Sequence, residues 1–167
     1  MPHSVETILA VRASAESVWA IISDFSSVKR YSAKVESSPI VGDTTHGLGT
    51  KRKCTFYDKS TVTEEIVEYE EGRSLRIALS EYSMPLKSLH AEMKVLPIDD
   101  TSCQVSFGME YVVKFGPIGW VMGTVMMKPL MRGVTKNVLN GLAYHVVTGN
   151  DIGTALPTAD ELRLALV

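Results

Sequence analysis

The chain has 167 residues, of which 45% are hydrophobic and 22% are charged, as expected for one globular domain with its own core. Its formal net charge of −2 excludes a chain-wide electrostatic attraction to nucleic acid or to anionic membranes. The single basic cluster, Lys51–Lys53, lies in an alternating strand pattern and is typical of a solvated face.

The cysteines and histidines show no pattern that would form a disulfide framework or hold a metal. Cys54 and Cys103 lie in separate strand-like runs, where a free cysteine behaves as a small apolar residue. The four histidines show no paired spacing with cysteines or carboxylates, so we expect neither a metal nor another cofactor. No leader pattern opens the chain and no apolar stretch reaches the length of a membrane span, so we expect a cytoplasmic protein.

The N-terminal part predicts one strand followed by two short helices. Apolar and polar residues alternate along Ser4–Arg12, as in a strand. Ser14 is a good N-cap residue, and Glu16 falls in the first turn of a helix that ends near Asp24. The segment 25–31 suits a second short helix or a turn.

From residue 33 onward the pattern changes to the period of two that is typical of strands. Because these runs follow one another at hairpin spacing, they predict an antiparallel meander, which brings the total to about seven strands. Pro39 places the first of them at an edge of the sheet. The six runs are Val35–Val41, Thr50–Asp58, Thr61–Tyr69, Leu75–Leu79, Leu89–Val95 and Val105–Tyr111.

The segment Gly116–Thr148 predicts one dominant helix, which is the only cover large enough for the apolar face of the sheet. Gly116 and Pro117 suit its start, and Gly149 suits its end. We therefore expect an α+β domain over residues 1–149. The tail, 150–167, contains a capping-box spacing from Thr158 to Glu161, which predicts a short terminal helix or a frayed end.

The long helix changes its apolar face along its length. At about 100° per residue, Ile118, Met122 and Val125 lie roughly 140 to 200° away from the main apolar stripe. Because Pro129 lies close to the change, we expect a bend or a change of phase there. The later part would then grip the sheet, while Pro117–Lys128 would line the cavity mouth or contact a membrane, a lid or a second subunit. The stripe consists of Met127, Met131, Val134, Val138, Leu142 and His145.

Several short motifs follow one another in a characteristic order. They are ASAESVW at Ala13–Trp19, Asp24 with Phe25, Tyr31, Val35, GLGT at Gly47–Thr50, EIVEY at Glu65–Tyr69 and FGPIG at Phe115–Gly119. Across roughly residues 4–148, this order resembles the START-related helix-grip superfamily (SRPBCC), and within it the polyketide cyclase/dehydrase-like branch. Tyr31, where many relatives carry Trp, and the polar run Thr61–Tyr69 depart from the pattern.

The resemblance implies a helix-grip fold, in which a curved antiparallel sheet wraps around the long C-terminal helix and leaves a cavity between them. It implies no single activity, because the members include lipid carriers, metabolite binders, cyclases and a chaperone activator. Function must therefore be argued from the residues that line the cavity.

Arg52 and Glu65 are the candidate polar or catalytic residues. Arg52 shares a strand face with Cys54, and counting along the next strand from Tyr69 turns Glu65 inward as well. The two could form a structural ion pair, a polar anchor for a ligand or an acid–base pair. His90 and Glu110 fall opposite apolar neighbours and should face water.

We expect the cavity to bind or transport a small hydrophobic molecule such as a lipid, a polyketide or another secondary metabolite. The alternatives are a metal-free enzyme of the cyclase/dehydratase type and a protein-interaction module like the chaperone activators. A homodimer could form through Pro117–Lys128 or through the tail. The expected lining residues are Arg52, Cys54, Phe56, Glu65, Tyr69, Phe107, Met109, Tyr111, Trp120, Met122, Met126, Met127 and Met131.

Overall fold

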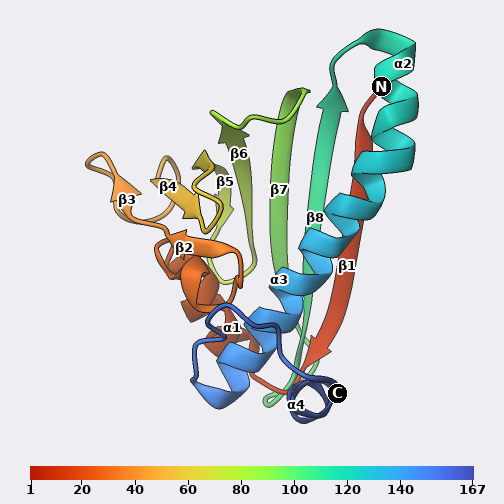
Figure 1. The fold of residues 1–167 in the computed structure, drawn as a ribbon. Helices are drawn as coiled ribbons and strands as arrows, with labels where there is room; N and C mark the ends of the chain where they lie inside the picture. Colours follow the sequence, from red (N-terminus) through yellow and green to blue (C-terminus); the bar gives the residue numbers. More distant parts are fainter.

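The computed structural model describes all 167 residues, and its centre is an open antiparallel sheet of eight strands (Figure 1). Strands β4 to β8 form the expected meander, and β1 closes the sheet beside β8. Along the sheet the order is β1 (His3–Val11), β8 (Cys103–Val113), β7 (Leu86–Pro97), β6 (Ser74–Ser80), β5 (Thr61–Glu70), β4 (Lys51–Phe56) and β2 (Val35–Ser37), with β3 (Ile40–Val41) also paired to β4.

The extra strand arises because the run predicted as one strand, residues 35–41, is broken at Ser38 and Pro39. The Ser38 hydroxyl donates a hydrogen bond to the carbonyl of Ser26 at 2.6 Å. This contact directs Ser38 away from β4, so the backbone pairing with β4 is interrupted here. Pro39 has no N–H to donate, but its carbonyl accepts from the Lys53 N–H at 3.0 Å. The prediction of a single edge strand was therefore wrong, and the edge position was confirmed.

Two short helices follow β1, as predicted. Helix α1 (Ala15–Ser23) begins after Ser14, whose hydroxyl accepts the Ser17 N–H at 3.1 Å. A single 3₁₀ turn, η1 (Ser27–Arg30), comes next. Together they bring the following loop, with Tyr31, under the long helix.

The long C-terminal helix has three parts, α2 (Gly116–Met122), the π-helical turn η2 (Gly123–Met127) and α3 (Lys128–Thr148). The predicted change of phase is confirmed, but it lies in the turn before Pro129 and takes the form of a π turn. Because Pro129 has no N–H, the regular bonding pattern fails here, and the Lys128 N–H reaches back to the carbonyl of Gly123. Gly149, at φ 74°, ends the helix in the left-handed conformation.

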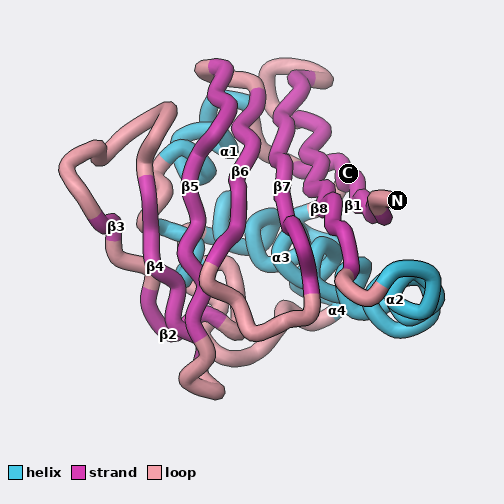
Figure 2. The backbone as a smooth tube through the Cα atoms, turned by 90° about the horizontal axis from the view of Figure 1, so that it is seen from above, coloured by secondary structure: helices cyan, strands magenta, loops and turns pink.

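Helix α3 lies across the β1 and β8 end of the sheet, on the same side as α4 (Figure 2). The buried Thr135 hydroxyl meets that of Thr7 at 2.8 Å, and Leu139 and Leu142 pack into the core. Gly141 allows close approach of the loop, because a Cβ there would lie 2.0 Å from the carbonyl oxygen of Tyr31.

The C-terminal tail folds back onto the domain. Helix α4 (Ala159–Ala165) has the predicted capping box between Thr158 and Glu161. Leu166 forms an isolated bridge with Val11, and the Arg12 N–H donates to the carbonyl of Ala165 at 2.9 Å. The tail thus packs beside the end of β1.

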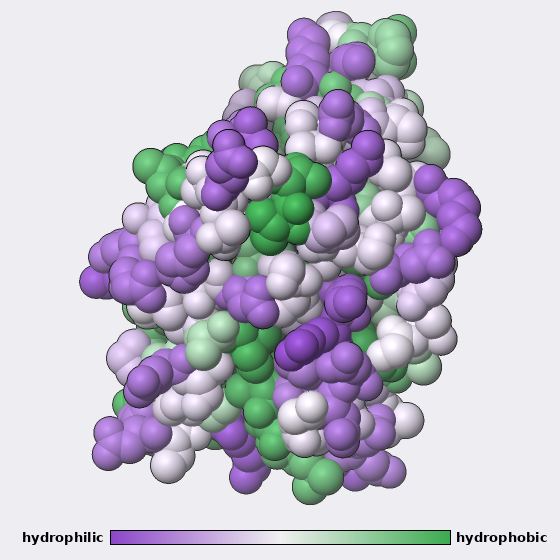
Figure 3. Space-filling view, turned by 90° about the vertical axis from the view of Figure 1, so that its left-hand side faces the viewer, coloured by the Kyte–Doolittle hydropathy of each residue, from purple (hydrophilic) through white to green (hydrophobic).

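The surface over the β2–β4 edge is mixed, with apolar patches lying among polar side chains (Figure 3). None of the helices has both the length and the apolar composition needed to cross a membrane.

Candidate functional site

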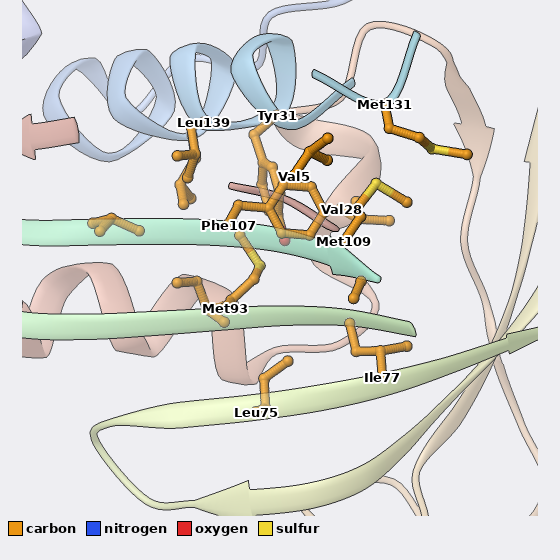
Figure 4. Close-up of a cluster of buried hydrophobic side chains, with 14 of the residues drawn as sticks. Val5, Val28, Tyr31, Leu75, Ile77, Met93, Phe107, Met109, Met131 and Leu139 are labelled. Carbon is orange, nitrogen blue, oxygen red and sulfur yellow. The ribbon is translucent and has the colours of Figure 1, made fainter. Parts of the chain in front are cut away.

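A cavity of about 620 Å³ lies between α3 and the sheet. Side chains from both sides project into this layer, among them Met131 from the helix and Met93, Phe107 and Met109 from the strands (Figure 4). Of its 32 lining residues 21 are hydrophobic, so the cavity offers an apolar environment with a small number of polar groups. Its volume falls in the range of about 300 to 1,000 Å³ that is usual for small-molecule sites.

An ion pair between Arg52 and Glu64 forms the polar end of this cavity. The two residues are direct cross-strand partners on β4 and β5, and Nη2 of Arg52 lies 2.5 Å from Oε2 of Glu64. The arginine Nε donates to the same oxygen, and Nη1 donates to the carbonyl of Phe25 at 2.8 Å. The guanidinium also lies 3.9 Å from the centre of the Phe25 ring. The pair is therefore well bonded and carries no net charge.

Tyr31 and Cys54 lie beside the ion pair and remain protonated at neutral pH. Burial, and then the charge of Glu64, raise the pKa of the Cys54 thiol to about 12. Burial likewise raises the pKa of Tyr31, although the positive charge of Arg52 opposes this. The Cys54 sulfur lies 3.7 Å from Oε2 of Glu64 and behaves as a buried, unreactive thiol.

Glu65 does not point into the cavity, so its predicted inward orientation was wrong. Its side chain is 42% exposed on the outer face of the sheet, 3.5 Å from Nζ of Lys51. The error arose at a β-bulge between Ile66 and Glu68, which changes the alternation of β5. Counting back from Tyr69 crosses this bulge and assigns Glu65 to the wrong face.

The expected lining residues divide into two groups. Six of them surround the cavity, and the other seven lie elsewhere. The six are Arg52, Cys54, Phe56, Phe107, Met109 and Met131. The seven are Glu65, Tyr69, Tyr111, Trp120, Met122, Met126 and Met127.

The two tyrosines of the second group have structural contacts of their own. Tyr111 is fully buried, and its hydroxyl donates to the carbonyl of Gly123 at 2.9 Å, so it holds the π turn against β8. Tyr69 packs against Trp19 and donates to the carboxylate of Glu71 at 2.7 Å. Neither hydroxyl is directed into the cavity.

The residues of α2 and the π turn lie beyond the cavity. Trp120 packs against His3 on β1, with ring centres 5.8 Å apart, and Met122 is half-buried. Met126 is 67% exposed, whereas Met127 is buried in the core. The methionine-rich part of the helix thus contributes only Met131 to the cavity.

The cavity also contains residues that the sequence analysis missed. Glu64 alternates with the buried Val62 and Ile66, and this spacing could have identified it. Gly133 and Asn137 lie four residues apart on α3 and form part of the helical wall.

The outward orientation predicted for His90 and Glu110 is confirmed. They are cross-strand partners on the outer face, where Oε2 of Glu110 lies 3.3 Å from Nη2 of Arg76. No group of three or more His, Cys, Asp or Glu side chains converges in a way that could hold a metal ion.

The curved sheet, the long helix laid against it and the cavity between them define a helix-grip protein. The family model described as polyketide cyclase/dehydrase and lipid transport matches residues 2–147. The chain belongs to this family, which confirms the resemblance seen in its motifs. A comparison with curated proteins found no match.

Solved structures share the fold at low sequence identity. An NMR structure of a protein from Thermobifida fusca has a TM-score of 0.69 and 24% identity, covering 86% of this chain and 92% of that one. Truncated norcoclaurine synthase from Thalictrum flavum has a TM-score of 0.66 and 18% identity, covering 89% and 95%. An uncharacterised protein from Bacillus thuringiensis has a TM-score of 0.69 and 16% identity, covering 84% and 96%. At these identities the likeness shows the fold alone.

Proposed function

We propose that the chain binds a small, largely apolar molecule in the cavity between α3 and the sheet. The observation that carries this proposal is the cavity itself, which has about 620 Å³ of space and mostly hydrophobic walls. Met93, Met109 and Met131 supply flexible side chains that can adapt to the shape of a ligand. The family description, which includes lipid transport, agrees with such a ligand.

The ligand would carry a neutral hydrogen-bonding group at one end. All the contacts of Glu64 with Arg52 and Cys54 involve Oε2, so Oε1 would be the atom that accepts a hydrogen bond from a ligand. Because Arg52 is already neutralised by Glu64, a free carboxylate on the ligand would find no unpaired cation directly beside Glu64. A hydroxyl or phenol group suits this end of the cavity better than an acid.

Acid–base catalysis of the cyclase type is the weaker candidate. Glu65, on which that hypothesis depended, lies outside the cavity. In the polar cluster, Tyr31 and Cys54 have raised pKa values, and Arg52 occupies one oxygen of Glu64. The cluster is therefore better suited to holding a polar group than to transferring protons.

Gly133 offers a sharp test of ligand binding. It lines the cavity, and a Cβ added there would meet no atom within 4 Å, so a larger side chain can enter the open space. We expect native mass spectrometry of the wild-type protein, purified from cells, to show a co-purifying small molecule. Gly133→Phe should lose that molecule because its ring fills the site.

Gly133→Ala is the matched control. It changes the same helix position without filling the cavity, and it should retain the ligand. It should also stabilise the fold by about 1 kcal/mol, because alanine favours a helix over glycine. Wild-type protein that is empty, or a Phe variant as fully loaded as the Ala variant, would contradict the proposal.

A further inference from the structure

A dense group of exposed apolar side chains, here called the stripe, lies along the start of the long helix. The segment from Phe115 to Leu130 contains seven of the 18 large hydrophobic side chains that the whole chain exposes. Ile118 is 82% exposed, and Val125 and Met126 are each 67% exposed. So dense a group of exposed apolar residues is typical of a surface that contacts something other than water. The seven are Phe115, Ile118, Trp120, Val121, Val125, Met126 and Leu130.

The same helix is purely cationic. Between Glu110 and Asp151 the sequence contains no acidic residue, although the chain as a whole has more acidic than basic residues. The three cationic residues of this helix, and Lys114 just before it, have no carboxylate within 4.0 Å, whereas Arg52, Arg76 and Lys94 are all paired. These four are Lys114, Lys128, Arg132 and Lys136.

We propose that this stripe and its cations dock the protein on the surface of an anionic phospholipid membrane. An apolar helix face flanked by lysine and arginine, with Trp120 at its side, has the chemistry of a helix that lies in the plane of the lipid headgroups. The attraction is local to this helix, because the chain as a whole carries a net charge of −2.

The stripe lies next to the cavity, so a membrane bound to the stripe would also lie next to the cavity. Pro129 and Leu130 line the cavity, and Leu130 also ends the exposed stripe. Docking would therefore place one wall of the cavity at the membrane, where an apolar ligand could pass without crossing water. This last step rests on the proposed function, whereas docking itself rests only on the stripe and its charges.

A second copy of this chain fits the same surface less well. A symmetric dimer through the stripe would bring two sets of these unpaired cations into one interface, with no acidic residue of this helix to balance them. An anionic lipid surface supplies the missing charge.

Vesicle flotation tests the docking. The wild-type protein should float with vesicles of equal parts phosphatidylglycerol and phosphatidylcholine, and not with pure phosphatidylcholine. The variant Ile118→Gln/Val125→Gln/Met126→Gln should bind roughly tenfold more weakly, because it removes apolar area from the stripe. The variant Leu48→Gln/Ile98→Gln/Leu164→Gln changes three apolar residues of similar exposure elsewhere and should bind like the wild type.

The charges have a matched pair of variants as well. Lys114→Gln/Arg132→Gln/Lys136→Gln should reduce binding roughly a hundredfold, because each cation near an anionic surface adds about 1 kcal/mol to the affinity. Lys29→Gln/Lys53→Gln/Lys87→Gln removes three other exposed and unpaired lysines, and should leave binding unchanged.

Three results would overturn the docking. The first is that the wild type does not float with anionic vesicles, and the second is that a stripe variant and its control float equally well. The third is that the wild type forms a stable dimer in sedimentation equilibrium and that the stripe variant is a monomer. Gly133→Phe separates the two proposals, because it should lose the cavity ligand and still float with anionic vesicles.

Discussion

Two ion pairs lie one residue apart on the same two strands and differ in almost everything else. Arg52 and Glu64 face the cavity, with side-chain exposures of 7% and 13%. Lys51 and Glu65 face water on the other side of the sheet, at 48% and 42%. Both pairs join β4 to β5 through direct cross-strand partners.

The difference shows that the pleat of the sheet, more than the chemistry of the residues, decides what such a pair does. A buried pair is costly to break, because removing one partner leaves the other as an unpaired charge. An exposed pair competes with water and salt and contributes little. Arg52 and Glu64 can therefore anchor both the fold and a ligand, while Lys51 and Glu65 have neither role.

The largest expected effect is that of Glu64→Ala. Arg52 would remain buried without its partner, so we expect a loss of about 3 to 5 kcal/mol in the free energy of unfolding. Urea denaturation at neutral pH measures it. Glu64→Gln is the control, since the amide oxygen can still accept a bond from Arg52, and it should cost less. A loss below about 1 kcal/mol for the alanine variant would contradict the pair's structural role.

An intermediate effect is expected at alkaline pH. The pKa of Cys54 rises in the fold from its ordinary value near 9 to about 12. The folded thiol thus stays protonated while the unfolded thiol ionises, so stability is complete below pH 9 and falls as pH rises from 9 toward 12. For one such group the slope reaches about 1.4 kcal/mol per pH unit.

Cys54→Ala should reduce that slope, as measured by urea denaturation at a series of pH values. Cys103, whose pKa is about 11, and Tyr31 would still contribute the remainder. An identical slope in the variant and the wild type would show that Cys54 does not titrate as its burial implies.

The smallest effect is expected for Glu65→Ala. Its partner Lys51 stays hydrated, so the loss should be about 0.2 to 1 kcal/mol and should shrink further in high salt. The same urea denaturation, with and without added salt, measures it. A loss as large as that of Glu64→Ala would remove the distinction between the two pairs.

Local pattern was enough to predict most of the fold. The alternation of strands, the Ser14 cap, the Gly149 end and the Thr158 capping box all depend on residues close together in sequence, and the structure contains each of them. Pro39 on its own predicts only an edge position. A proline shows where a ladder is weak, but whether the chain leaves the ladder depends on contacts such as that between Ser38 and Ser26.

The candidate site was harder to predict, for a physical reason. The alternation of Val62, Glu64 and Ile66 indicates the inward face before the bulge, but the position of the bulge, between Ile66 and Glu68, depends on how β5 pairs with β6. The one extra residue in the bulge reverses which side chains face inward, so the prediction chose Glu65 in place of Glu64. Pro129 marks where the long helix changes phase, but the hydrogen bond from the Tyr111 hydroxyl on β8 to the carbonyl of Gly123, which holds the π turn in place, joins separate elements and cannot be read from the helix alone.

The most direct test of the central claim is fluorescence titration with 2-naphthol, a neutral apolar phenol, and with its acid analogue 2-naphthoate. We expect the wild type to bind 2-naphthol more tightly than 2-naphthoate at neutral pH. Glu64→Gln should weaken 2-naphthol binding, while Glu65→Gln should leave it unchanged. Equal weakening by both variants, or tighter binding of the acid, would contradict a cavity whose polar end is built by Arg52 and Glu64.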